Sequence, residues 1–154
     1  MITTTKNFVH KETHKVWLVD TSVWIDFLKG NETKQVVYLE RILKSGETVY
    51  LTPVIYQEIL QGAESDKRFK QFKEYFGSQP FVQPLDPVES HVEAARLYFR
   101  CRKKGVTIRS TIDCFIAQIA IENEFMLLHS DKDFELMESV ISKLKVVSFE
   151  NKAS

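Results

Sequence analysis

Short apolar runs alternate with longer amphipathic segments along most of the chain. Residues 16–19 form a run of β-branched, aromatic and aliphatic side chains that is too short for a helix, which predicts a buried strand. Residues 49–51 and 125–128 have the same character, and residues 81–82 and 144–147 are further strand candidates. These runs predict strands at regular intervals between helical segments.

Apolar positions at helical spacing predict helices between the strands. The first follows residue 20, with Thr21 or Ser22 placed to cap its start. Further helices are expected over residues 32–44, 53–62, 65–76 and 88–103, and after the capping pair Ser110 and Thr111. In the helix over residues 88–103, the side chains expected to face the core are Val92, Ala95, Tyr98 and Phe99. In the helix after residue 111, they are Ile112, Phe115, Ile116 and Ile119.

The alternation of strands and helices predicts an α/β protein with a mainly parallel sheet and helices on both of its faces. The length of 154 residues favours one domain with a substantial core. We assign this domain to residues 16–149, with an N-terminal extension over residues 1–15 and a polar tail over residues 150–154.

Composition narrows the class of protein only slightly. The formal net charge is zero, so charge as a whole predicts neither nucleic-acid nor membrane binding. Cys101 and Cys114 are the only cysteines, which favours neither a disulfide scaffold nor a zinc site and suggests a reduced, cytoplasmic protein. No apolar run is long enough to span a membrane, and the first residues lack the apolar core of a secretion signal.

Basic residues are concentrated in one stretch, residues 96–109. It contains six cations and no acid, more than a helix end needs to complement its own dipole. They are Arg96, Arg100, Arg102, Lys103, Lys104 and Arg109. This basic stretch predicts a surface that contacts phosphates.

Four acidic positions share a place in the expected fold. Asp20 and Asp131 follow strands, Asp113 starts a helix, and Glu58 borders an apolar helix face. Taken singly, an acid in such a place usually begins a turn, complements a helix dipole or lies on the surface. In a parallel sheet with right-handed crossovers, however, strand ends and the helix starts that follow them lie along one edge. The four carboxylates are therefore expected to converge.

Converging carboxylates need a cation. Two of them 4 Å apart repel by about 1 kcal/mol in water and by roughly 4 kcal/mol at an effective dielectric constant near 20. An all-oxygen cluster without His or Cys suits a hard ion such as Mg²⁺ or Mn²⁺, which activates water and neutralises a phosphate under attack. Together with the basic stretch, the acids predict metal-dependent hydrolysis of a phosphodiester.

Four motifs place these acids in a wider sequence context. They are Leu18-Val19-Asp20-Thr21-Ser22-Val23-Trp24-Ile25, Glu58 followed by Gly62, Asp113 within Thr-Ile-Asp-Cys-Phe-Ile-Ala, and Asp131-Lys132-Asp133-Phe134. They resemble the PIN domain and, more closely, the VapC ribonuclease toxins of bacterial toxin–antitoxin pairs. Each motif is weak alone, but their order and spacing together are specific. The resemblance covers nearly the whole of residues 16–149.

The resemblance implies a three-layer α/β/α sandwich and a Mg²⁺- or Mn²⁺-dependent endoribonuclease. It assigns Asp20, Glu58 and Asp113 to the three firm family acids, with Asp20 and Asp113 as the direct metal ligands. Asp131 matches the fourth acid, and Asp133 could share or replace its role. Ser22, or else Thr21, matches the hydroxyl that orients the first acid.

The resemblance also implies partners. They are an RNA substrate, a VapB-type antitoxin that blocks the site, and a second toxin copy in a homodimer or hetero-oligomer, with operator DNA bound only through the antitoxin. The antitoxin is expected to occupy an apolar groove near the early helices, for which Trp24 and Phe27 are candidates.

Two other functions remain open from the sequence. One is a phosphatase with an aspartyl nucleophile after the first strand, although Ser22 stands where that chemistry wants a second acid. The other is a noncatalytic PIN-like binding module, against which the presence of all four acids argues.

Overall fold

The computed structural model describes residues 15–149, and its centre is a small parallel sheet. The strands are β1 (Val16–Val19), β2 (Thr48–Tyr50) and β3 (Met126–Leu128), in the order β2-β1-β3. In the register, Leu18 of β1 lies between Tyr50 of β2 and Leu127 of β3. The expected extension over residues 1–15 lies, apart from residue 15, outside the described residues, as does the tail over residues 150–154.

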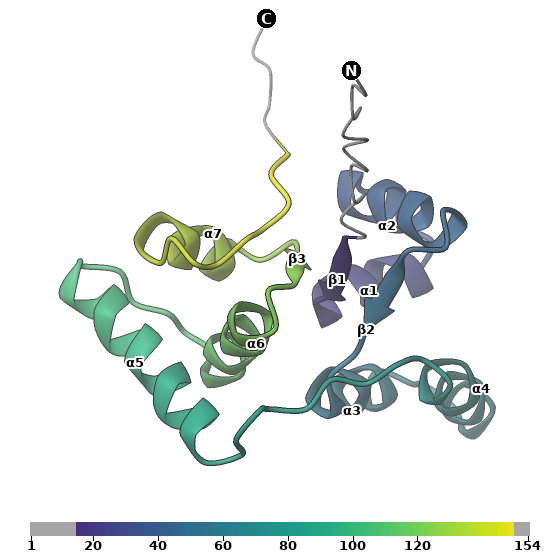
Figure 1. The fold of residues 1–154 in the computed structure, drawn as a ribbon. Coiled ribbons are helices and arrows are strands. Elements are labelled where there is room, and N and C mark those ends of the chain that lie inside the picture. Colours follow the sequence, from purple (N-terminus) through teal and green to yellow (C-terminus); the bar gives the residue numbers. More distant parts are fainter. Residues whose placement is uncertain (1–14, 150–154) are drawn as a thin grey trace, which may run out of the picture.

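Two groups of helices cover the sheet (Figure 1). The first comprises α1 (Thr21–Leu28), α2 (Lys34–Lys44), α3 (Pro53–Gln61) and α4 (Asp66–Gly77), which pack on one another in series. The second comprises α5 (Glu89–Lys103), α6 (Thr111–Glu122) and α7 (Lys132–Val140). The sheet lies between the two groups, so the expected α/β/α arrangement is confirmed.

The two further strand candidates form single bridges instead of full strands. Phe81 pairs with Leu51, and Val146 pairs with Leu127, both in parallel. Pro80 and Pro84 flank the first of these segments and have no N–H to donate to a ladder, which limits the pairing there.

Hydroxyl side chains begin four of the helices, and among them the cap at Ser110 was predicted from the sequence. Thr33, Thr52, Ser65 and Ser110 each accept a hydrogen bond from the backbone N–H three residues on. The prediction for α1 was wrong, because its N-cap is Asp20 and not Thr21 or Ser22. Helix α7, which the sequence pattern did not predict, is capped in the same way by Asp131.

The inward face predicted for α5 was wrong. The buried residues are Ser90, Ala94, Leu97 and Cys101, while Val92, Tyr98 and Phe99 are 43%, 36% and 55% exposed. Small residues at 90 and 94 let α5 approach α6 closely, so the helix turns its bulkier apolar side chains outward. On α6, Ile116 and Ile119 are buried as predicted, Phe115 is half-buried, and Ile112 is exposed.

Trp24 belongs to the core. It is 1% exposed and makes an edge contact with Phe76 of α4, with ring centroids 5.0 Å apart. The expectation that Trp24 lines a groove for a partner is therefore wrong, whereas Phe27 beside it is only half-buried.

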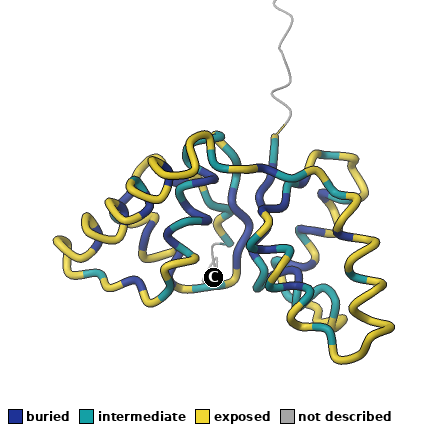
Figure 2. Tube along the Cα trace, turned by 90° about the horizontal axis from the view of Figure 1, so that it is seen from below, coloured by how far each residue is buried: buried dark blue, intermediate teal, exposed yellow. Residues whose placement is uncertain are grey.

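Figure 2 shows that buried positions gather along the centre of the molecule and that exposed positions dominate the outer helices. Within residues 15–149, none of the helices combines the length and apolar character needed to cross a membrane.

Candidate metal centre

Asp20 lies at the carboxyl end of β1, where the chain turns into α1. Its carboxylate is 5% exposed and accepts hydrogen bonds from the backbone N–H of Ser22 at 3.1 Å and from the Ser22 hydroxyl at 2.6 Å. Burial raises the pKa of Asp20 above its ordinary value, although the Ser22 bonds and nearby His129 act in the opposite direction. The fold therefore buries the Asp20 carboxylate where few groups neutralise its negative charge.

The Ser22 hydroxyl also connects two segments that are far apart in the sequence. While it donates to Asp20, its oxygen accepts a hydrogen bond from the backbone N–H of Ser130 at 3.2 Å. Ser22 thereby joins the end of β1 to the loop after β3.

Glu58 reaches the same region from α3. The Thr21 hydroxyl donates to its Oε1 at 2.9 Å. Burial raises the pKa of Glu58, and the nearby charge of Asp20 raises it further. Thr21 and Ser22, which the sequence offered as alternatives for one role, thus each hold a different acid.

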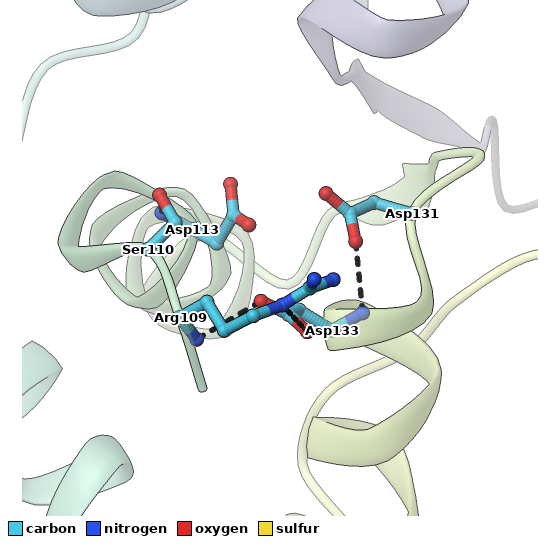
Figure 3. Close-up of polar contacts among 5 residues, drawn as sticks. All are labelled: Arg109, Ser110, Asp113, Asp131 and Asp133. Carbon is cyan, nitrogen blue, oxygen red and sulfur yellow. Dashed lines mark hydrogen bonds and ion pairs between the residues drawn. The ribbon is translucent and has the colours of Figure 1, made fainter. Parts of the chain in front are cut away.

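Asp113, Asp131 and Asp133 form a compact group. Each offers a carboxylate oxygen, and these three oxygens lie within 4.8 Å of one another. Asp113 comes from the first turn of α6, where its backbone N–H donates to the Ser110 hydroxyl at 3.3 Å. Figure 3 shows Asp113 and Asp131 approaching one another from α6 and from the start of α7.

The pKa of Asp113 depends on the other acids of the site. Its pKa rises to about 7, first because of burial and then because of the charges of Asp20, Asp131, Asp133 and Glu58. The acids that the sequence singled out therefore lie close enough to act on one another electrostatically, as the sheet topology predicted.

Asp133 differs from its neighbours in having a cationic partner. It is 3% exposed, and its Oδ2 accepts a hydrogen bond from the backbone N–H of Arg109 at 3.0 Å. The Arg109 Nε lies 3.5 Å from the other oxygen, Oδ1. Asp131 instead caps α7 and accepts the backbone N–H of Asp133 at 2.9 Å.

His129 is a site residue that the sequence motifs did not single out. Its side chain is buried, and its Nδ1 accepts a hydrogen bond from the backbone N–H of Asp131 at 3.2 Å. Burial lowers the pKa of His129, which outweighs the opposing charges of Asp20, Glu135 and Asp131 and favours a neutral ring. Its position directly after β3 was the one available signal.

The donor set fits a hard divalent cation. Carboxylate oxygens converge without Cys or His among the closest three, as Mg²⁺ and Mn²⁺ prefer. Burial, and after it the charges of the neighbouring acids, raise the pKa of Asp113, and a bound ion would relieve the repulsion among these acids.

The basic stretch reaches this centre through Arg109. Its members from Arg96 to Lys104 are exposed on the second half of α5 and just after it, and Arg109 is the member that contacts an acid of the group.

Comparison with known proteins identifies the family. The family model of the PIN domain matches residues 17–139. Among curated proteins, the VapC ribonuclease Mb1587 of Mycobacterium bovis and ribonuclease VapC11 of Mycobacterium tuberculosis are each 29% identical over 133 residues, which cover 86% of this chain and 98% of theirs.

Solved structures show the same fold. VapBC2 from Rickettsia felis, bound to a DNA fragment from its promoter, aligns with a TM-score of 0.66 and 16% identity over 88% of this chain and 99% of the matched chain. VapBC-1 from nontypeable Haemophilus influenzae aligns with a TM-score of 0.64 and 17% identity over 86% of this chain and 96% of the matched chain. Because the family model extends over most of the chain, from β1 into α7, this protein belongs to the PIN domain family.

Proposed function

We propose that this protein is a divalent-metal-dependent endoribonuclease that acts as the toxin of a toxin–antitoxin pair. The observation that carries the proposal is the meeting of Asp113, Asp131 and Asp133, with Asp20 and Glu58 close enough to raise the pKa of Asp113. The similar curated proteins are named as VapC ribonucleases, which supports RNA as the substrate.

Asp113 and Asp131 would hold Mg²⁺ or Mn²⁺ together with Asp20, and Asp133 is within reach of the same position. When bound, the ion would supply an activated water and positive charge for the attacked phosphate. Glu58, whose pKa is raised by burial, would take the proton of the attacking water, while Ser22 and Thr21 hold Asp20 and Glu58 in place.

The basic stretch would hold the RNA backbone. Its exposed cations at the end of α5 face solvent beside the loop that leads to Asp113. Contacts of this kind bind phosphates irrespective of sequence, so they favour a polyanionic substrate without specifying which RNA.

A small antitoxin would keep the site blocked. The solved structures with this fold include VapBC assemblies, one bound to promoter DNA, which supports an antitoxin partner and DNA binding through that partner. We also propose a toxin homodimer or hetero-oligomer in the cytoplasm. Exposed Val37 on α2 and Phe69 on α4 take the place of buried Trp24 as candidates for the antitoxin contact near the early helices.

The alternatives fit the geometry less well. An aspartyl phosphatase needs an approachable nucleophile, whereas Asp20 is 5% exposed and held by Ser22. A noncatalytic module would have no need for a group of acids in which burial and neighbouring charges raise the pKa of Asp113 to about 7.

The test is incubation of the purified protein with total RNA in Mg²⁺, in Mn²⁺ and in chelator. We expect cleavage with the ions and none in chelator. Asp20→Asn and Asp113→Asn should abolish cleavage, whereas Asp66→Asn, which changes an exposed acid on α4, should not.

Cleavage that persists in chelator, or in both variants of the acid group, would overturn the proposal. Release of phosphate from a small phosphoester without RNA cleavage would favour the phosphatase, and absence of both Mg²⁺ binding and cleavage would favour the noncatalytic module.

A further inference from the structure

Arg109 is held beside the acid group by two contacts to one residue. Its backbone N–H donates to Oδ2 of Asp133 at 3.0 Å, and its Nε lies 3.5 Å from Oδ1. Because the first contact comes from the backbone and the second from the side chain, Asp133 fixes both the loop before α6 and the direction of the Arg109 side chain.

Most of the Arg109 guanidinium remains available. The side chain is 77% exposed, and among the residues that the structure describes it contacts no acceptor other than Asp133. A guanidinium carries five N–H donors in a planar fork, and only the Nε donor faces Asp133. The remaining edge can bind two oxygens of one phosphate.

The free edge of the Arg109 guanidinium lies near the acid group. In Figure 3 the guanidinium lies beside Asp133, below the carboxylates of Asp113 on α6 and Asp131 before α7. The Arg109 N–H bond to Asp133 joins the segment before α6 to the first turn of α7, and the Ser110 cap holds Asp113 at the start of α6, so the cation and the acids are held in one arrangement.

Asp133 is less suited than its neighbours to be a metal ligand. It belongs to the group of three acids within 4.8 Å, but both of its oxygens already face Arg109. Asp131 uses Oδ1 to cap α7 and keeps its other oxygen, and no cation contacts Asp113 within the described residues. An ion bound by Asp133 would have to compete with Arg109 for the same oxygens.

We propose that Arg109 binds a phosphate of the RNA next to the ion held by Asp113 and Asp131, and that Asp133 is a positioning residue for Arg109 instead of a metal ligand. This inference rests on the proposed function, because it names how the same site holds its substrate. Asp113 and Asp131 then bind the metal ion, whereas Asp133 binds the guanidinium of Arg109.

Two binding measurements test the division without relying on cleavage. The first is calorimetric titration with Mn²⁺ of the wild-type protein and of the variants Arg109→Gln, Asp133→Asn and Asp131→Asn. The second is fluorescence anisotropy of a labelled 12-nucleotide RNA in chelator, where the proposed function expects no cleavage.

We expect Arg109→Gln to weaken RNA binding about 10–100-fold, the range for loss of charge-assisted hydrogen bonds, while Mn²⁺ affinity changes less than about threefold. Asp133→Asn should weaken RNA binding similarly, and the double variant should be no weaker than Arg109→Gln. Arg109→Lys should be intermediate, because an ammonium keeps the charge but not the fork. Arg68→Gln, which removes an exposed arginine of α4 outside the basic stretch, is the matched control and should have a small effect.

The inference is overturned if Asp133→Asn reduces Mn²⁺ affinity as much as Asp131→Asn does, or if Arg109→Gln leaves RNA binding unchanged. It is also overturned if the Asp133→Asn effect on RNA persists in the Arg109→Gln background. A wild-type protein that binds the labelled RNA but never cleaves it would contradict the proposed function alone, because the two binding measurements would still separate the role of Arg109 from that of the metal ligands.

Discussion

The Asp113 carboxyl group owes its unusual chemistry to its neighbours. Its pKa rises from 3.8 to about 7 through burial and through the charges of the other acids. Between these two values the folded protein keeps a proton that the unfolded chain has already released. The metal-free protein should therefore lose stability as the pH rises from about 4 to about 7.

The variant Asp113→Asn should not lose this stability as the pH rises. The full shift would correspond to about 4 kcal/mol, but Asp113 is only half-buried, so solvent screening reduces our expectation to about 1–2 kcal/mol. In chelator at pH 8 the variant should have the higher free energy of unfolding, whereas at pH 4 the two proteins should be equally stable. Urea denaturation at several pH values measures this, and equal pH profiles for the two proteins would contradict the electrostatic coupling.

His129 gives a second prediction at this scale. Its Nδ1 accepts the backbone N–H of Asp131, and the oxygen of an asparagine side chain can occupy nearly the same place. We expect His129→Asn to bind Mn²⁺ with nearly the affinity of the wild type. His129→Leu should bind Mn²⁺ about tenfold more weakly, which is the lower end of the range for residues that orient metal ligands. Calorimetric titration with Mn²⁺ compares them, and equal affinities in the two variants would show that the hydrogen bond has no such role.

Single residues of the site could be predicted to different degrees. Asp20, Asp113 and Asp131 were recognisable because each follows a strand or starts a helix. The pairing of Asp133 with Arg109 could not be predicted, because it joins the loop before α6 to the first turn of α7 through a backbone N–H that no sequence pattern marks.

Among the helices, α6 depends on its first turn to place Asp113. Ser110 caps the helix by accepting the backbone N–H of Asp113 at 3.3 Å. We expect Ser110→Ala to cost about 1 kcal/mol of unfolding free energy and to weaken Mn²⁺ binding, and Ser110→Thr to restore most of both. Urea denaturation and Mn²⁺ titration of the two variants check this, and an alanine variant with unchanged stability would contradict the capping role.

Helix positions were easier to predict than helix faces. The helix after Ser110 has the predicted cap, and the helices expected over residues 32–44, 53–62 and 65–76 begin close to their expected starts. On α5, however, two apolar stripes compete, and the closely packed one contains small residues such as Ala94. Only the presence of α6 decides between them, so tertiary contacts override the local pattern.

At the scale of the whole molecule, the basic stretch gives a neutral protein a local positive surface. If Lys103 and Lys104 contact RNA phosphates, replacing both with Gln should reduce the slope of log affinity against log salt concentration by up to about 1.4, roughly 0.7 for each contact to a single strand. Replacing Lys67 and Lys70, which are exposed on α4, removes the same charge and should leave the slope unchanged. Equal slopes for the two double variants would show that the basic stretch has no special place in RNA binding.

The parallel sheet is what brings the acids together. β1 and β3 are neighbours, and the backbone N–H of Asp20 donates to the Leu128 carbonyl at 2.9 Å, so the segments after both strands begin side by side. The order of strands and helices made this convergence predictable. The reduction of the strand candidates at residues 81–82 and 144–147 to single bridges was not predictable, because it depends on contacts between distant segments.

The central claim is that carboxylates scattered along the sequence share one divalent ion. Its most direct test is calorimetric titration with Mn²⁺ of the wild-type protein and of four variants, Asp20→Asn, Asp113→Asn, Asp131→Asn and Asp66→Asn. We predict binding by the wild type and by the Asp66→Asn control, with uptake weakened at least about tenfold in the other three and accompanied by proton release near pH 7. Absence of binding by the wild-type protein, or equal affinity in all five proteins, would contradict the account.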